Sequence, residues 1–276
     1  MYVPKYPKTQ SLWKRDMRMF CDCADLNFPG IVNKCPNCGG KPSKVEGFGL
    51  IVPGQYTWPE FQAVENWHVT EKIHGQNIRI VCNVQHFDNA PSEYEVVFYG
   101  RRGKEGSVNK YLLPRLKKYF TADLFKSAFN LEFDDEKENY QQQVILYGEG
   151  YGDKIQSWHY GLEEEQSFIL FDVVVGGIWL TQETVTELAQ ELGIERVPIL
   201  YSSETKYKAI DLCVRGFESR LCPGHPAEGV VARSEPLMLH RTRRTPIMWK
   251  LKCKDYDALR QFKTTGVVQP DKYKGF

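Results

Sequence analysis

The chain has 276 residues, 42% of them hydrophobic and 26% charged, and its 36 basic residues are nearly balanced by 35 acidic ones. This composition is close to that of an average globular protein, which excludes a disordered tail protein and a fibrous repeat. Because the formal net charge is only +1, any attraction for a nucleic acid has to come from local clusters of charge.

The sequence shows neither a membrane span nor a secretion signal. The longest apolar stretch, residues 168–180, is interrupted by Asp172 and is shorter than the ~20 residues that a bilayer span needs. The first ten residues lack the apolar run of a signal peptide. We therefore expect a cytoplasmic, monomeric protein with no membrane partner, built from one large domain and a small appendage.

The N-terminal residues 1–44 differ from the rest, because they hold four of the eight cysteines and almost no periodic apolar pattern. Cys21 and Cys23 form one close pair, and Cys35 and Cys38 form a second pair after eleven intervening residues. Four thiolates in two pairs suit a tetrahedral Zn²⁺ ion. The alternative is four unligated thiols, which so few apolar residues could scarcely bury. We predict a zinc module over residues 1–44 and a main domain over residues 45–276.

Strands outnumber helices in the predicted main domain. Side chains alternate along a strand, so residues 78–84 place Ile78, Ile80, Cys82 and Val84 on one face. Segments rich in β-branched and aromatic residues predict further strands. These segments are residues 95–99, 144–148, 167–175, 229–233 and 247–252.

Two helices are predicted in the same region, over residues 182–192 with Gly193 as a stop signal, and over residues 255–262. Residues 109–131 are partly helical, and Pro114 must start, kink or divide that helix. The acidic residues 132–138 are expected to form a loop. Mixed strands and helices in this proportion indicate an α+β fold of antiparallel sheets.

The segment Thr70–Asn77 places Lys72 beside a His74–Gly75 turn, just before a strong strand. A lysine followed three residues later by glycine occurs about once by chance in a chain of this length, so this motif alone is weak. Its weight comes from five later elements that lie on or beside predicted strands. They are residues 99–103, 147–150, 168–172, 228–231 and 249–252.

This series resembles the covalent nucleotidyltransferase superfamily of polynucleotide ligases and mRNA-capping enzymes, whose motifs I, III, IIIa, IV and V come in this order. The resemblance spans residues 68–254. The run Glu71-Lys72-Ile73-His74-Gly75-Gln76-Asn77 is most similar to the RNA ligase 2 family, whereas DNA ligases and capping enzymes usually have aspartate where this chain has His74. The resemblance implies a nucleotidyltransferase fold of antiparallel sheets around an ATP pocket.

The same resemblance implies a role for each matching residue. Lys72 would be the nucleophile that forms lysyl-AMP, and Glu149 and Glu228 would hold Mg²⁺ or Mn²⁺ or contact the ribose. Lys250 and Lys252 would contact phosphate. Other residues implied to contact the nucleotide are Glu71, Ile73, Asn77, Arg101, Phe171 and Val230. Phe171, rather than Phe168, would stack on adenine, and Asn77 would also serve a later sealing step.

Physical chemistry supports these assignments, because a lysine can form a phosphoramidate only through its uncharged amine, and a free lysine titrates near pH ~10.4. Nearby cations lower that value, and Lys250, Lys252 and Arg101 are candidates for this field. Lys250 and Lys252 are two residues apart on a predicted strand, so both project from one face while Leu251 points into the core. Taken singly, each of these lysines would be an ordinary surface residue.

Local charge points to a nucleic-acid partner. Residues 101–118 and residues 233–254 each carry seven basic residues and one acidic residue. Such stretches are often only solvated faces, but in this chain they flank motifs that handle phosphate. We therefore expect RNA, or an RNA/DNA hybrid, as the partner.

The predicted function is ATP-dependent RNA ligation. The alternatives are an ATP-dependent DNA ligase, a capping guanylyltransferase and a non-catalytic nucleic-acid-binding protein that has kept the fold. We expect no C-terminal OB or helical domain. The zinc module would instead take over nucleic-acid binding, so that deleting residues 1–44 would spare lysine adenylylation but weaken sealing.

Overall fold

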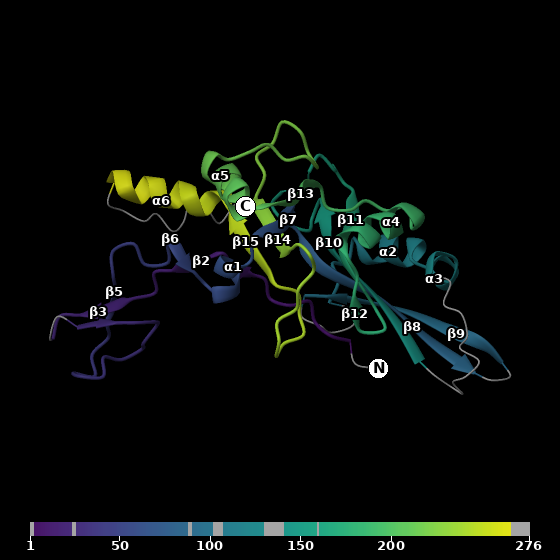
Figure 1. Ribbon diagram of the computed structural model, residues 1–276, viewed down its shortest axis with the longest axis horizontal. Coiled ribbons are helices and arrows are strands. Elements are labelled where there is room, and N and C mark those ends of the chain that lie inside the picture. Colours follow the sequence, from purple (N-terminus) through teal and green to yellow (C-terminus); the bar gives the residue numbers. More distant parts are fainter. Residues whose placement is uncertain are drawn as a thin grey trace.

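The computed structural model describes residues 3–23, 26–87, 90–101, 107–129, 141–158 and 160–265. Two five-stranded sheets lie side by side and form most of the protein (Figure 1). Strand β1 runs parallel to β15, and the remaining strand pairs of these two sheets are antiparallel. The predicted mixed fold of antiparallel sheets is thus confirmed. No helix in the described ranges has the length and apolar character needed to cross a membrane.

The first sheet has the order β1-β15-β14-β7-β13. Its strands are β1 (Gln10–Ser11), β7 (Asn66–Glu71), β13 (Ile199–Thr205), β14 (Gly229–Ser234) and β15 (Met248–Lys252). Alternation along β7 buries Trp67 and Val69 in a core shared with Val230 and Trp249. The opposite face, which carries Thr70, turns toward the second sheet. The helices α1 (Pro59–Ala63), α5 (Lys206–Arg215) and α6 (Cys253–Thr265) accompany this sheet.

The second sheet has the order β12-β11-β10-β8-β9. Its strands are β8 (Gln76–Phe87), β9 (Ala90–Gly100), β10 (Gln141–Gly152), β11 (Gln166–Val175) and β12 (Ile178–Trp179). The predicted face of Ile78, Ile80, Cys82 and Val84 is fully buried in one core cluster, which confirms that prediction. Residues of α2 (Leu113–Tyr119), α3 (Ala122–Phe129) and α4 (Gln182–Glu191) pack into the same cluster.

The predicted helices are present with adjusted ends. Helix α4 begins after Thr181, whose side chain accepts a hydrogen bond from the Thr184 backbone, and Gly193 follows it with a φ of 62°. Pro114 lies in the first turn of α2 and so starts that helix. Helix α6 begins at Cys253, directly after β15. The predicted acidic loop at 132–138 lies outside the described residues.

The N-terminal residues divide differently from the predicted boundary at residue 44. Strand β1 joins the first sheet, with Ser11 opposite Lys250. Leu12 and Trp13 are buried in the main core, and the Trp13 indole donates a 2.8 Å hydrogen bond to the Tyr256 hydroxyl. The physical reason is hydrophobic: two large apolar side chains of this segment find their burial in the main domain. Strand β2 (Trp13–Arg15) then pairs with β6 (Ile51–Tyr56).

The cysteines lie in a separate three-stranded sheet with the order β4-β3-β5. Its strands are β3 (Met19–Cys21), β4 (Leu26–Phe28) and β5 (Ser43–Lys44). We call residues 16–44 the cysteine module. It extends from the main body at the end opposite the second sheet (Figure 1).

Candidate active site

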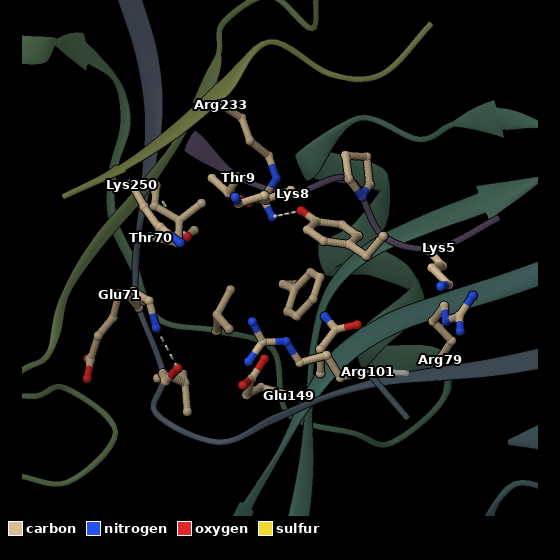
Figure 2. A pocket seen from close by; sticks show the side chains of 18 residues that line it. Lys5, Lys8, Thr9, Thr70, Glu71, Arg79, Arg101, Glu149, Arg233 and Lys250 are labelled. Carbon is tan, nitrogen blue, oxygen red and sulfur yellow. Dashed lines mark hydrogen bonds between the residues drawn. The ribbon is translucent and has the colours of Figure 1, made fainter. Parts of the chain in front are cut away.

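A cavity of about 400 Å³ lies between the two sheets (Figure 2). Strands of both sheets supply its walls, and the N-terminal segment passes along it. The predicted site residues that line it are Glu71, Lys72, Ile73, Asn77, Arg101, Glu149, Phe171 and Lys250. The structure therefore brings together residues that are up to 179 positions apart in the printed sequence, since the set runs from Glu71 to Lys250.

Lys72 follows β7 directly and is held there by its backbone, which donates a 2.9 Å hydrogen bond to the Gly229 carbonyl. A side chain at Gly229 would collide with the Leu251 carbonyl, and its φ of 151° is one that other residues rarely adopt. Gly75, in the turn after Lys72, leaves equally little space, because a Cβ there would collide with the Gly150 carbonyl. Gly229 thus lets β14 lie close to β15, and Gly75 lets the turn after Lys72 lie close to β10.

Glu228 precedes β14 and joins two lysines. One carboxylate oxygen lies 2.5 Å from Lys72 Nζ, and the other lies 2.6 Å from Lys252 Nζ. Burial opposes ionisation of this carboxyl, but the charges of Lys72 and Lys252 outweigh that cost and hold the pKa of Glu228 below its ordinary value. In the free protein the candidate nucleophile Lys72 is therefore ion-paired with Glu228, which also pairs with Lys252.

Glu149, on β10, has a different environment. Burial raises the pKa of Glu149 to about 8, although Lys72 and Arg101 act in the opposite direction. Within the described ranges Glu149 makes no ion pair. Glu149 is half-buried, lines the same cavity as Lys72 and has no ion-pair partner among the described residues, so its carboxyl is a suitable ligand for a hard divalent cation such as Mg²⁺ or Mn²⁺.

Lys250 and Lys252 project from one face of β15 while Leu251 is fully buried, as the strand spacing predicts. Lys250 lines the cavity. Glu228 and Lys252 do not line it, and they are joined to its wall through the ion pair of Glu228 with Lys72. Burial lowers the pKa of Lys250, and the charges of Lys72 and Lys252 add to this effect. The three ammonium groups of Lys72, Lys250 and Lys252 exceed the single negative charge of Glu228. The positive charge that remains suits a polyphosphate.

Two predicted contacts are arranged differently from the expectation. The Val230 side chain is buried in the core of the first sheet, and its neighbour Val231 lines the cavity instead, because strand alternation admits only one of them. The Glu71 side chain points away from the cavity (Figure 2) and accepts hydrogen bonds from Ser219 Oγ at 2.5 Å and the Arg220 backbone at 2.8 Å.

The two phenylalanines separate as predicted. Phe171 lines the cavity, whereas Phe168 packs into the core with its ring 5.5 Å from that of Phe120. Arg101 also lines the cavity, but the following motif residues Arg102 and Gly103 lie outside the described residues.

The model of the RNA ligase family matches residues 65–250. The chain belongs to the RNA ligase family. Among solved structures it is similar to several forms of an RNA ligase from Naegleria gruberi. A lysine-to-alanine mutant with ATP and Mn is 18% identical over 72% of this chain and 52% of that chain, with a TM-score of 0.46. The present chain thus spans about half the length of that Naegleria gruberi protein.

Two further structures of the Naegleria gruberi RNA ligase are similar to this chain. A lysine-to-methionine mutant with AMP and Mn is 19% identical over 74% of this chain and 54% of that chain, with a TM-score of 0.48. The form with PPi is 14% identical over 91% of this chain and 86% of that chain, also with a TM-score of 0.48. A search of curated proteins found no match.

Sequence reasoning missed one wall of the cavity in this RNA ligase family member. The N-terminal residues Lys5, Tyr6, Pro7, Lys8 and Thr9, which we call the strap, line the cavity. The Pro4 carbonyl accepts hydrogen bonds from Arg79 at 3.0 Å and Tyr147 at 3.1 Å, so the start of the strap is fastened to the second sheet. The following β1 is fastened to the first sheet.

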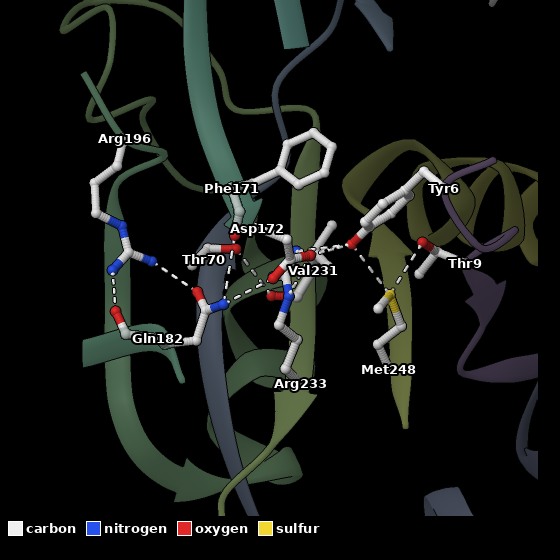
Figure 3. Close-up of polar contacts among 10 residues, drawn as sticks. All are labelled: Tyr6, Thr9, Thr70, Phe171, Asp172, Gln182, Arg196, Val231, Arg233 and Met248. Carbon is white, nitrogen blue, oxygen red and sulfur yellow. Dashed lines mark hydrogen bonds and ion pairs between the residues drawn. The ribbon is translucent and has the colours of Figure 1, made fainter. Parts of the chain in front are cut away.

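A buried polar network also escaped prediction. Arg233 of the first sheet and Asp172 of the second form a 2.7 Å ion pair, and each side chain is 3% exposed. The Tyr6 hydroxyl donates to Asp172 at 2.5 Å and accepts from Arg233 at 3.0 Å (Figure 3). Its ring meets Phe171 edge-on, with the centroids 4.8 Å apart. The sequence offered no signal for Tyr6 beyond an aromatic residue between two lysines.

The cysteine module of the RNA ligase family chain brings all four predicted thiols together, with their sulfur atoms within 4.8 Å of one another. Asn37 and Gly40 donate backbone N–H groups to Cys35 and Cys38, both at 3.4 Å. Backbone donors from Cys38 and Asn37 act against burial and lower the pKa of Cys35 to about 7. Four convergent sulfurs with N–H donors fit a tetrahedral Zn²⁺ ion.

Proposed function

We propose that the chain is an ATP-dependent RNA ligase that works through a covalent lysyl-AMP intermediate on Lys72. The observation that carries the proposal is the placement of Lys72 on the wall of the cavity, 2.5 Å from Glu228 and beside Lys250 and Glu149. Membership of the RNA ligase family supports the same reaction class. A nucleotide in this cavity would lie between the amines and Phe171.

In the first step, the neutral Lys72 amine would attack the α-phosphorus of ATP. The proton of the ammonium form goes to solvent before attack. A P–N bond then forms, the P–O bond to the β-phosphate breaks, and pyrophosphate leaves, while the second N–H proton that the amine loses passes to the pyrophosphate or to solvent. Because Lys72 is ion-paired with Glu228 in the free protein, the two must separate first. Lys250 and Arg101 would position the phosphates by charge.

A divalent cation fits this site because Glu149 is a half-buried carboxyl of the cavity without an ion-pair partner in the described residues and Glu228 lies beside Lys72. Mg²⁺ or Mn²⁺ would be held by Glu149 and Glu228 and would supply charge neutralisation at the phosphates. Phe171 would stack on the adenine, with Ile73 and Val231 completing the apolar part of the cavity.

In the later steps, AMP would pass from Lys72 to the 5′-phosphate of a polynucleotide, and a 3′-hydroxyl would then displace AMP and seal the strand. Asn77 lines the cavity close to these events, which suits its expected role in sealing. The partner would be RNA or an RNA/DNA hybrid. The basic stretches around residues 107–118 and 233–254 would contact its phosphates.

The experiment that tests this proposal is an intact-mass measurement after incubation with ATP and Mg²⁺. We expect the parent protein to gain the mass of AMP, Lys72→Ala to gain nothing, and the exposed control Lys208→Ala to behave as the parent. No gain in the parent, or an equal gain in Lys72→Ala, would refute the proposal. Replacing ATP by GTP separates this activity from capping, and RNA and DNA ends of the same sequence separate the two ligase classes.

We also propose that the cysteine module binds one structural Zn²⁺ ion through Cys21, Cys23, Cys35 and Cys38. The convergence of the four sulfur atoms supports this. Elemental analysis of the purified chain should find one zinc per molecule in the parent and in a Cys222→Ser control, and none in Cys35→Ser. Equal zinc in Cys35→Ser and the parent would contradict the assignment.

A further inference from the structure

A second, smaller cavity of about 150 Å³ lies beside the first, and Glu228 lines it. The same glutamate carboxylate is ion-paired with Lys72, so the two cavities meet at the proposed reacting centre. Lys72 itself lines only the larger of these two cavities. The proposed steps with ATP do not use the smaller cavity, which we call the second cavity.

Aromatic rings form one wall of the second cavity. Trp158 and Tyr160 are both half-buried and line it, with their ring centroids 5.9 Å apart and their planes at 74°. Trp158 is also held edge-to-face by His225, at 4.8 Å and 86°. Two perpendicular neighbours fix the orientation of the indole while a part of its surface stays open to the cavity.

Tyr160 connects this wall to the turn after Lys72. Its hydroxyl accepts a 2.7 Å hydrogen bond from the His74 backbone N–H. Its φ of 52° lies in the left-handed region, which a bulky residue enters only when its surroundings require it. A ligand that moves Tyr160 in the second cavity would therefore act on the backbone of His74, two residues from the proposed nucleophile Lys72.

Positive charge lies at one side of the same cavity. Lys254 lines it at the start of α6, and Lys252, two residues earlier, is paired with Glu228. Pro226 and Ala227 supply apolar surface. The second cavity thus combines a flat aromatic surface, an apolar floor and a nearby ammonium group. It is too small for the nucleotide that the 400 Å³ cavity would hold.

We propose that the second cavity binds the terminal nucleobase of a polynucleotide end, stacked on Trp158, with Lys254 near the adjoining phosphate. This inference rests on the proposed function and adds to it a binding site for the strand. Flat bases stack on aromatic side chains whatever their sequence, and their backbone phosphates need a cation. Proximity to the Lys72–Glu228 pair would bring the strand end to the transferred AMP.

The test compares polynucleotides with and without a terminal base. Binding of fluorescently labelled RNA oligonucleotides is measured by anisotropy, with an abasic residue at the 5′ end, at the 3′ end or at neither. For the parent protein we expect one abasic end to raise Kd by about tenfold to a hundredfold. The end that does so identifies whether the donor or the acceptor strand occupies the second cavity.

Three variants complete the experiment. Trp158→Ala should bind the intact oligonucleotide as weakly as the parent binds the abasic one and should lose nothing further with the abasic one, whereas Trp158→Phe should recover most of the affinity. Tyr207→Ala, an exposed aromatic on α5 (67% exposed), should match the parent. Adenylylation of Lys72, followed by mass, should be unchanged in Tyr207→Ala.

Equal affinity of the parent for intact and abasic ends overturns the inference, and this comparison needs no variant to fold. Losses from Trp158→Ala and the abasic end that multiply also overturn it, because the base and the indole would then act separately. Failure of the parent to adenylylate Lys72 would instead refute the proposed function, and the binding comparison would still report on the second cavity.

Discussion

The two walls of the larger cavity differ in how they are built. The wall around Lys72 and Lys250 consists of charged side chains on or beside strands of the first sheet, and Glu228 pairs with Lys72 behind it. The opposite wall consists of Phe171 and the strap, where Tyr6 is fastened by hydrogen bonds to the buried Asp172–Arg233 pair. In the proposed function the first wall carries the reaction, whereas the second joins the two sheets and the strap through hydrogen bonds.

This difference separates two kinds of residue around the larger cavity: the charged residues near Lys72 and the buried Asp172–Arg233 pair. On the first wall the Lys72 side chain is 19% exposed, and the positive charges of Lys72, Lys250 and Lys252 outnumber the one carboxylate of Glu228, so they can respond to an anionic ligand. The Asp172–Arg233 pair on the second wall is 3% exposed on both sides, and Asp172 also accepts hydrogen bonds from Gln182 and Tyr6. Substitutions on the two walls should therefore separate activity from stability.

The largest effect on stability is expected from Asp172→Ala. The substitution leaves the Arg233 guanidinium buried without its counter-ion, and such losses cost about 3–5 kcal/mol of unfolding free energy. Urea denaturation followed by circular dichroism measures the change. Asp211→Ala, which removes an exposed pair with Arg215 on α5, should cost less than about 0.5 kcal/mol. Similar losses for the two variants would mean that the buried pair does not join the sheets.

Tyr6→Phe tests the strap with a smaller change. It keeps the ring against Phe171 but removes the hydroxyl that donates to Asp172. Hydrogen bonds to charged groups contribute about 1.5–3 kcal/mol, and we expect a loss in that range together with a severalfold rise in the KM for ATP in lysine adenylylation. Tyr207→Phe is the exposed control. A full loss of stability with an unchanged KM would show that the strap has no part in the nucleotide site.

The same two walls explain what the sequence could and could not predict. Lys72, Glu228, Lys250 and Lys252 lie on or beside strands, where period-two alternation decides which side chains share a face, and the structure places all four in one cluster. Alternation alone did not decide between neighbours in every case, since Val230 was expected at the nucleotide and Val231 lines the cavity.

The strap could not be predicted for a different reason. Its role depends on Tyr6 meeting Asp172 and Arg233, contacts across 166 and 227 positions of sequence, and no local pattern encodes such distances. The expectation that residues 1–44 form one module also rested on local composition. The apolar pair of Leu12 and Trp13, buried in the main core, was the available signal that this segment belongs to the main domain.

His68, a buried residue of β7, gives a test by pH of the packing between the two sheets. Burial, helped by the charges of Arg196 and Arg233, lowers the pKa of His68 to about 4. The unfolded chain binds the proton at higher pH than the folded chain does, so stability is fully present above about pH 6.5 and is lost as the pH falls toward 4. His68→Gln should remove this part of the pH dependence, on the order of 2 kcal/mol between pH 7 and pH 4.5.

The measurement for His68 is the urea unfolding free energy of the parent and the variant at both pH values. Other groups titrate in the same range, so the informative quantity is the difference between the two proteins at each pH. The exposed His225→Gln is the matched control. A parent and a His68→Gln variant with parallel pH profiles would contradict the buried neutral imidazole.

The smallest effect on adenylylation is expected from a substitution in the cysteine module. This expectation contrasts with the strap, where Tyr6→Phe should raise the KM for ATP. Deleting residues 1–44 cannot show whether the module is dispensable, because the deletion also removes Lys5–Thr9 from the cavity. Cys38→Ser disturbs the module alone, since its four sulfurs lie together and the module extends away from the two five-stranded sheets (Figure 1). We expect adenylylation of Lys72 to change less than twofold, while joining of RNA ends weakens if the module contacts the strand. An adenylylation loss as large as that of Tyr6→Phe would mean that the module supports the cavity as the strap does.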